Sequence, residues 1–390
     1  TLIHRRGKRS SGLFLRKNEK TGKNCKDSGV MKKILVVDDS ALMRRVICDI
    51  INMDGRFHVE DTAINGVEAL KLLQEKAYDG VVLDVNMPKM SGIELLKELN
   101  RQKISARVVM NSSMTREGAQ ITLEALELGA IDFVHKPLSV LDAKADKFRS
   151  RFLNILWEAT AANFPSPKRR SGISQIGKYK FRRMEDGPVK LRISQPVAGR
   201  KLVAIACSTG GPKALQQVIP KLPGNLDAPV LVVQHMPSGF TESLAERLNT
   251  LSELSVKEAE PGDKLLSGHV YIAKGGTHLK VKKERGESHI EFGDEAPREG
   301  VKPCANYMYE SLADSEFDQI VCVVMTGMGA DGTEGILNLD KKKQIYVIAQ
   351  EKSTCAVYGM PRAIGMTGLV NQVAALDDIA QQIIKNVGVR

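Results

Sequence analysis

The sequence has no uninterrupted apolar run of the length that crosses a membrane. A transmembrane helix needs about 20 mostly apolar residues, whereas the apolar stretches here have the length of strands, as at residues 202–207. The first thirty residues are basic and polar and contain no apolar segment of the kind found in secretory signal peptides. We therefore expect a cytoplasmic protein without stable membrane insertion.

Paired cysteines are also missing. The six cysteines are scattered, and none forms a Cys-x-x-Cys pair. Cys48, Cys207 and Cys322 lie in apolar stretches, which is typical of reduced thiols in a protein core. The spacing thus predicts neither a disulfide framework nor a cysteine metal site.

Basic residues are abundant but unevenly placed, and the formal net charge is +11. Residues 1–30 hold nine Lys and Arg against two acidic residues, and residues 164–201 hold eleven against two. Both segments lack apolar periodicity, so we expect a disordered basic extension over 1–30 and a proline-containing linker. A nucleic-acid reader needs its basic residues on a folded surface, so we expect no nucleic-acid partner. A strand follows Met31, and we expect the residues before it to be an upstream extension.

Strand and helix patterns alternate in two long parts of the chain. Five alternations between residues 34 and 134 predict one domain over 31–148, and a second alternating region predicts another over 200–390, joined by a linker at 149–199. Such alternation favours a doubly wound parallel sheet in each domain, with the site at the carboxyl ends of the strands. The strands expected in the second domain are 202–206, 230–234, 270–273, 279–282, 320–325 and 345–349.

Polar side chains end four strands of the first domain. Asp38 and Asp39 follow the first strand, Asp84 ends the third, Ser112 the fourth and Lys136 the fifth. Three carboxylates at one sheet edge repel one another unless a divalent cation, here Mg²⁺, neutralises them. One carboxylate could then accept a phosphoryl group. The alternative is that these are ordinary strand-end acids that cap helices.

The second domain begins with an apolar run that breaks into Ser208-Thr-Gly-Gly-Pro212, and a helix pattern follows at once. Strand, tight turn and helix lift a side chain to the sheet edge, beside the free amides of a helix N-terminus. Ser208 is therefore a candidate nucleophile next to groups that bind an oxyanion. As an alternative, the serine only caps the helix.

A serine nucleophile needs a base and an orienting carboxylate. His235 ends the apolar run 230–234, at the edge where Ser208 is expected, and Asp331 follows the apolar run 320–325. Glycine-rich turns at 210–211 and 327–332 leave backbone amides for a developing oxyanion. Ser208, His235 and Asp331 are the predicted triad, which is recognised by geometry and not by chain order.

A competing motif overlaps this set. Gly327-Met-Gly-Ala-Asp-Gly332 fits the G-x-G-x-x-G pattern of dinucleotide sites, and Glu351 stands about twenty residues further on. The motif occurs late in its domain instead of at the first strand, and it leaves Ser208 and His235 without a role. We therefore favour the hydrolytic interpretation.

Residues 31–138 resemble the receiver domain of bacterial response regulators. The matching motifs are Ile34-Leu-Val-Val-Asp-Asp-Ser40, Val82-Leu-Asp-Val-Asn-Met-Pro88 with Ser91-Gly92, and Lys136-Pro137. The resemblance implies a flavodoxin-like fold and a histidine kinase as phosphodonor. It also implies a cis peptide bond before Pro137. The site residues it implies are phosphorylation at Asp84, Mg²⁺ held by Asp38, Asp39 and Asp84, a switch hydroxyl on Ser112, and a phosphate contact from Lys136.

Residues 200–388 resemble the catalytic domain of chemotaxis protein-glutamate methylesterases. The matching segments are Ala206–Pro212, Gln234-His-Met-Pro237, Thr326–Gly332 and Tyr358-Gly-Met-Pro361. The resemblance implies a Rossmann-like sheet and cofactor-free hydrolysis of γ-glutamyl methyl esters on chemotaxis receptors, with release of methanol and deamidation of receptor glutamines. It assigns transition-state support to Thr209, Gly210 and Met328. Ala206 stands where we expect glycine.

The two resemblances together imply regulation by docking. The unphosphorylated receiver domain would cover the active site, and phosphorylation of Asp84 would weaken that contact. The alternative is a response regulator whose second domain only binds a ligand. Loss of turnover in a folded Ser208→Ala variant distinguishes the enzyme from the binding module.

Overall fold

The computed structural model describes residues 31–390, except positions 114, 138, 140, 141, 144, 162–188 and 196. The basic extension predicted over 1–30 and most of the predicted linker lie outside the described residues. Of the helices in the described part, none is both long and apolar enough to cross a membrane.

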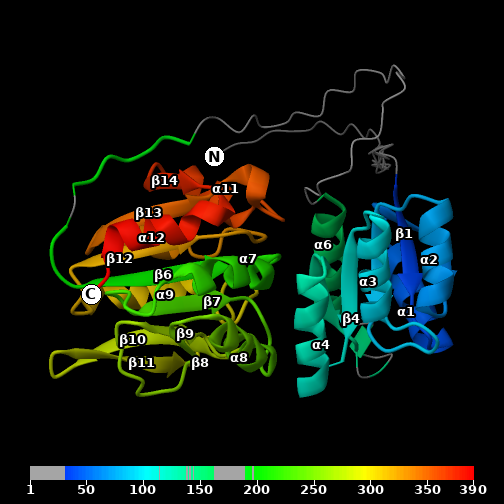
Figure 1. Cartoon of the computed structure of the whole chain (residues 1–390), viewed down its shortest axis with the longest axis horizontal. Coiled ribbons are helices and arrows are strands. Elements are labelled where there is room, and N and C mark those ends of the chain that lie inside the picture. Colours follow the sequence, from blue (N-terminus) through cyan, green and yellow to red (C-terminus); the bar gives the residue numbers. More distant parts are fainter. Residues whose placement is uncertain are drawn as a thin grey trace, which may run out of the picture. The chain divides into compact units, whose positions relative to one another are not determined.

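The first sheet has five parallel strands in the order β2-β1-β3-β4-β5. This is the flavodoxin-like order, in which the direction of strand addition reverses between β1 and β3. Polar side chains start the helices: Ser40, Asn65, Ser91 and Thr115 each accept a hydrogen bond from a first-turn amide. The elements are β1 Lys32–Val37, α1 Ala41–Asn52, β2 Phe57–Ala63, α2 Gly66–Glu75, β3 Gly80–Asp84, α3 Gly92–Gln102, β4 Val108–Ser112, α4 Arg116–Glu127, β5 Asp132–His135 and α6 Asp146–Ala161 (Figure 1).

Helix α6 belongs to the core of this first domain. Phe152, Leu156 and Ala159 are buried in the same apolar cluster as Ile34 and Val36 of β1. The sequence pattern of residues 138–163 predicts a helical tail, and residues 149–161, which our domain bounds assigned to the linker, belong to this packed helix because one of its faces is apolar.

The second sheet has seven parallel strands in the order β14-β13-β12-β6-β7-β9-β8. Strands β10 and β11 form a separate antiparallel hairpin. The strands are β6 Lys201–Cys207, β7 Val230–Gln234, β8 Ser255–Glu258, β9 His269–Ile272, β10 His278–Glu284, β11 Glu287–Gly293, β12 Gln319–Val324, β13 Gln344–Gln350 and β14 Val370–Ala374. The helices are α7 Gly211–Val218, α8 Phe240–Leu251, α9 Ala305–Ser311, α10 Thr333–Asp340, α11 Met360–Gly365 and α12 Ile379–Val387, with short 3₁₀ turns η1 Ile219–Lys221, η2 Leu312–Asp314, η3 Lys352–Thr354 and η4 Leu376–Asp378.

Both faces of the second sheet are covered. Successive residues of β6 alternate between two apolar clusters, with Val203 and Ile205 in one and Leu202 and Ala204 in the other. A strand that is buried on both faces has a continuous apolar sequence, as β6 does. The doubly wound parallel fold predicted for both domains is confirmed.

The strand register sets the position of the site. Strands β6 and β7 pair in parallel, with Cys207 opposite Gln234. The next residues, Ser208 and His235, therefore leave neighbouring strands at the same edge, and β12 lies on the other side of β6.

One expectation about the backbone is wrong. Among the described residues, the cis peptide bond joins Lys302 to Pro303, not Lys136 to Pro137. The trans isomer of a peptide bond before proline is favoured by about 0.5–1 kcal/mol. With the trans bond between Lys136 and Pro137, Lys136 Nζ lies 2.5 Å from Asp84 Oδ2.

Candidate active site and phosphorylation site

Ser208 occupies a sharp turn between β6 and α7. Its N–H donates to Thr326 O at 3.0 Å, and its carbonyl accepts from Gly211 N at 2.7 Å and from Gln234 Nε2 at 3.0 Å. Gly210 has a φ of 75°, which favours glycine, and a Cβ on Gly211 would lie 1.9 Å from Gln234 Oε1. The two glycines are therefore required by the turn that presents Ser208.

His235 and Asp331 form the predicted pair. His235 Nε2 lies 2.7 Å from Asp331 Oδ2, and the two side chains are 9% and 2% exposed. An ionised carboxylate only accepts hydrogen bonds, so Nε2 carries the proton and Nδ1 is the nitrogen left to act as base. No hydrogen bond joins Ser208 to His235 among the described residues, and such contacts often tighten only when substrate binds.

Asp331 is held by several donors besides His235. Its carboxylate accepts from the backbone N–H of Ala305 at 2.6 Å and of Asn306 at 3.0 Å, and from Cys304 Sγ at 3.0 Å. Burial opposes ionisation of Asp331, but the hydrogen bonds outweigh it and keep its pKa below the ordinary value. The carboxylate is thus charged and fixed beside the imidazole.

The glycine-rich turn after β12 lies against the serine. A Cβ added to Gly327 would be 2.8 Å from Ser208 Cβ and 3.0 Å from Ser208 N. Within the described residues, the Met328 N–H donates to no protein acceptor. Thr209 and Gly210 stand beside Ser208 at the start of α7. Amides at this point can receive a negative oxygen that develops on an acyl carbon.

The same turn does not suit a dinucleotide. A dinucleotide site leaves the amides that open its helix free for the pyrophosphate. Here Gly332 N donates to Asn306 Oδ1 and Asp331 Oδ1, and Gly335 N donates to Asn306 Oδ1. The amides at the start of α10 are therefore already paired within the protein.

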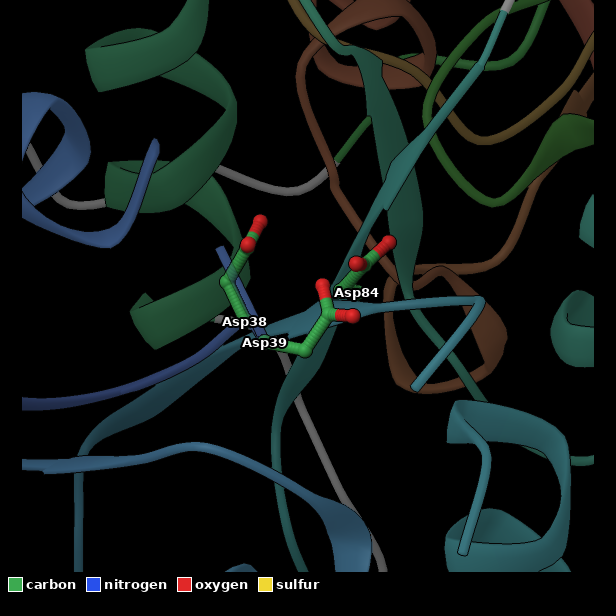
Figure 2. A group of neighbouring side chains, drawn as sticks. All are labelled: Asp38, Asp39 and Asp84. Carbon is green, nitrogen blue, oxygen red and sulfur yellow. The ribbon is translucent and has the colours of Figure 1, made fainter. Parts of the chain in front are cut away.

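In the first domain, three carboxylates gather at the ends of β1 and β3 (Figure 2). One oxygen from each of Asp38, Asp39 and Asp84 lies within 4.8 Å of the others. Asp38 Oδ2 is buried and accepts no hydrogen bond, and its contact is an ion pair of 3.3 Å with Lys136 Nζ. Hard oxygen ligands with an unpaired buried acceptor fit Mg²⁺.

The buried Asp84 carboxyl is harder to ionise than an ordinary aspartate. Burial raises its pKa to about 6, although the hydrogen bond from Lys136 opposes the rise. A cation at the three carboxylates would favour the charged form.

The Ser112 hydroxyl, predicted to act as a switch, makes hydrogen bonds to residues of α4. It accepts from Thr122 Oγ1 at 2.7 Å and donates to Gly118 O at 3.3 Å. These partners belong to α4, so the hydroxyl that we predicted to act as a switch is engaged with the helix that follows β4. Thr122 was not identified from the sequence, because its position within a helix pattern gave no signal.

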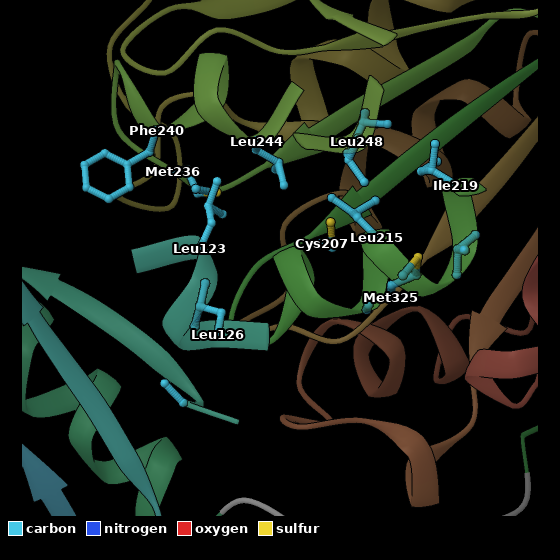
Figure 3. Close-up of a cluster of buried hydrophobic side chains, with 14 of the residues drawn as sticks. Leu123, Leu126, Cys207, Leu215, Ile219, Met236, Phe240, Leu244, Leu248 and Met325 are labelled. Atoms are coloured by element: carbon cyan, nitrogen blue, oxygen red, sulfur yellow. The ribbon is translucent and has the colours of Figure 1, made fainter. Parts of the chain in front are cut away.

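Residues of the first domain contact the catalytic turn within the compact unit 31–390. Thr209 Oγ1 donates to Asp132 Oδ2 at 2.6 Å, and the rings of Phe133 and Phe240 stack 4.8 Å apart. Leu123 and Leu126 of α4 share one buried cluster with Phe240 of α8 (Figure 3). Arg247 Nε is 2.8 Å from Glu127 Oε1 at the margin of that cluster.

Comparison with known proteins gives the same two regions. Residues 34–145 match the response regulator receiver domain family, and residues 203–383 match the CheB methylesterase family. The chain is 43% identical over 360 residues to protein-glutamate methylesterase/protein-glutamine glutaminase 1 of Syntrophomonas wolfei, covering 90% of this chain and 98% of the relative. It is 43% identical over 355 residues to the protein of the same name, without the number, from Bacillus licheniformis, covering 91% and 98%.

Among solved structures, the chain is similar to the CheB methylesterase catalytic domain of Thermotoga maritima. The identity is 40%, with 48% of this chain and 99% of that chain covered and a TM-score of 0.46. The match to full-length relatives extends through both domains. This chain belongs to the family of protein-glutamate methylesterases/protein-glutamine glutaminases that carry a response regulator receiver domain.

Proposed function

We propose that Ser208, His235 and Asp331 hydrolyse methyl esters of glutamate side chains on chemotaxis receptors, release methanol and also deamidate receptor glutamines. The observation that carries this proposal is the buried His235–Asp331 pair, 2.7 Å apart, at the sheet edge where Ser208 leaves the neighbouring strand. Membership of the family supports the substrate class.

The acylation step follows from this arrangement. Ser208 Oγ attacks the ester carbonyl carbon while His235 Nδ1 takes the hydroxyl proton, and the charged Asp331 stabilises the resulting imidazolium. The carbonyl oxygen becomes negative and accepts hydrogen bonds from the Met328 N–H and from the Thr209 hydroxyl or amide. His235 then gives its proton to the leaving methoxide, and methanol departs.

Deacylation repeats the sequence with water. His235 Nδ1 takes a proton from water, the hydroxide attacks the acyl carbon, and Ser208 leaves with the proton returned by His235. With a receptor glutamine the first leaving group is ammonia instead of methanol, and the acyl-enzyme is the same.

In the receiver, Asp84 would accept the phosphoryl group from a chemotaxis histidine kinase. Asp38, Asp39 and Asp84 would hold Mg²⁺, which supplies charge neutralisation at the transferring phosphoryl group. Lys136 Nζ lies 2.5 Å from Asp84 Oδ2 and is placed to contact the phosphoryl oxygens. Phosphorylation then weakens docking of the receiver on the catalytic turn. We propose that these reactions take place in the cytoplasm.

The test is methanol release from methyl-labelled receptor membranes. Wild type and Ser208→Ala are each assayed with and without Mg²⁺ and a small-molecule phosphodonor. We expect release that requires Ser208 and rises with phosphodonor. Equal release from wild type and from a folded Ser208→Ala variant would exclude the serine mechanism. Release that needs Ser208 but ignores phosphodonor would exclude the regulatory part of the proposal.

A further inference from the structure

A buried amide side chain stands behind the catalytic acid. Helix α9 begins next to Asp331, and Asn306 in its first turn is fully buried. Asn306 contacts neither Ser208 nor His235 by any hydrogen bond of the described residues, and the hydrolytic mechanism above does not use its side chain.

Every polar group of Asn306 that faces the catalytic loop is engaged. Its backbone N–H donates to Asp331 Oδ1 at 3.0 Å. Its side-chain Oδ1 accepts from Gly332 N at 3.1 Å and Gly335 N at 2.6 Å, and its Nδ2 donates to Glu299 Oε1 at 2.9 Å. One residue therefore binds the carboxylate of Asp331 and the backbone that follows it.

Helix α10 depends on this side chain for its start. Its N-cap is Gly332, with a φ of 91° and no side chain to accept a first-turn hydrogen bond. Asn306 supplies that acceptor from another helix. The two helices touch at backbone level, because a Cβ on Gly335 would lie 2.7 Å from Asn306 Cα. The position of Gly332, and of Asp331 immediately before it, is thus set by Asn306.

We propose that Asn306 is a positioning residue of the hydrolase, which fixes Asp331 against His235 Nε2 and so orients Nδ1 toward Ser208. This inference rests on the proposed function of the triad. Removal of the Asn306 amide would take away the acceptor of the Gly335 N–H and leave the Gly332 N–H with Asp331 Oδ1 alone, and the loop would move to satisfy these groups. A shift of about 1 Å in a catalytic group can cost ~10²-fold in rate.

The first test is Asn306→Ala in the full-length protein. We expect kcat for methanol release to fall about 10- to 100-fold, while KM for receptor membranes stays within about twofold, because no substrate-facing group changes.

The second test is a rescue that keeps the charge of the pair. Asn306→Asp retains an acceptor for Gly332 and Gly335 but loses the donor to Glu299. In combination with Glu299→Gln, the residue at position 299 becomes the donor and the residue at position 306 becomes the acceptor. The pair keeps one negative charge, which moves from position 299 to position 306. We expect the double variant to exceed Asn306→Asp alone in kcat, because the hydrogen bond between positions 306 and 299 is restored.

Asn371→Ala is the matched control. Asn371 is also buried, accepts from Val347 N at 2.8 Å and donates to Arg192 O at 2.9 Å, but it lies on the edge strand β14. We expect it to lower the melting temperature as Asn306→Ala does and to leave kcat of the folded protein unchanged.

An NMR signal that does not depend on catalytic turnover tests the role of Asn306 independently of the proposed function. The His235 Nε2 proton, hydrogen-bonded to Asp331, should give a downfield resonance in the proton NMR spectrum of the histidine-labelled protein. We expect that resonance to be lost or moved in Asn306→Ala and restored in the double variant. An unchanged resonance, or a kcat equal to that of the Asn371→Ala control, would overturn the role of Asn306. Failure of wild type to release methanol while the resonance responds would overturn only the proposed function.

Discussion

At the scale of single residues, the two sites use burial in opposite ways. Asp331 is buried among donors, and these hydrogen bonds keep its pKa low. Asp84 is buried with one cationic partner and another acid nearby, and burial raises its pKa to about 6. Asp331 therefore stays charged across the physiological range, whereas Asp84 takes up a proton as the pH falls toward 6.

This difference predicts how Mg²⁺ binding depends on pH. Protons compete with the cation for Asp84, so Mg²⁺ affinity should be nearly constant above about pH 7 and fall as the pH drops through 6. Well below that value the loss approaches tenfold per pH unit for one competing proton. Titration calorimetry at pH 5, 6 and 7.5 measures it, with Asp84→Asn as control. An affinity that is flat across this range in wild type contradicts the raised pKa.

At the scale of elements, the catalytic turns depend on close backbone approach. The turn after β12 passes so near Ser208 that a Cβ on Gly327 would lie 2.8 Å from the serine Cβ and 2.3 Å from Met360 Sδ. The Met360 side chain can move, but the serine turn is fixed by the hydrogen bonds of Thr326 and Gln234. A larger residue at 327 must therefore displace the turn that carries Met328.

Gly327→Ala should consequently lower kcat by about 10²-fold while the protein stays folded. Gly365→Ala is the control in the same domain, since its added Cβ would meet a Val189 methyl group at 3.2 Å. Methanol release and circular dichroism are measured on both variants. If Gly327→Ala retains wild-type kcat, the turn is not held as tightly as these distances indicate.

The sequence predicted the sheet strands near the site because each is a buried apolar run. Strands β6, β7 and β12 were recognised in this way, and with them the placement of Ser208, His235 and Asp331. Strands β8, β11 and β14 were missed, since they lie at an edge of the sheet or in the hairpin and mix polar with apolar residues. The supporting contacts of Asn306 and Gln234 were also missed, because residues far apart in sequence meet there only after folding.

At the scale of the whole chain, one hydrogen bond links regulation to chemistry. Thr209 Oγ1 donates to Asp132 at 2.6 Å, next to Ser208, while Phe133 stacks on Phe240. A hydrogen bond to a charged group contributes about 1.5–3 kcal/mol. The aromatic and leucine contacts join the receiver to the second domain, and the Asp132 carboxylate occupies the Thr209 hydroxyl, which the proposed mechanism offers, as an alternative to the Thr209 amide, to the developing oxyanion.

Asp132→Ala should therefore raise the activity of the unphosphorylated protein by roughly tenfold, in line with the loss of one such bond. The further stimulation by phosphodonor should shrink by the same factor. Glu60→Ala, which removes an exposed ion pair with Lys33, is the control and should change neither rate. Unchanged basal activity in Asp132→Ala would show that this hydrogen bond does not restrain the enzyme.

The single proton of the Thr209 hydroxyl has a wider consequence. It can be donated to Asp132 or to a substrate oxygen, but not to both, so the receptor and the docked receiver compete for it. Coupling between two binding events is reciprocal. If Thr209 contacts the substrate as proposed, a glutamyl ester at Ser208 and the docked receiver each weaken the binding of the other by the same factor. On the proposed mechanism the substrate is therefore an effector of the enzyme: a heavily methylated receptor would favour the state in which the receiver is not docked.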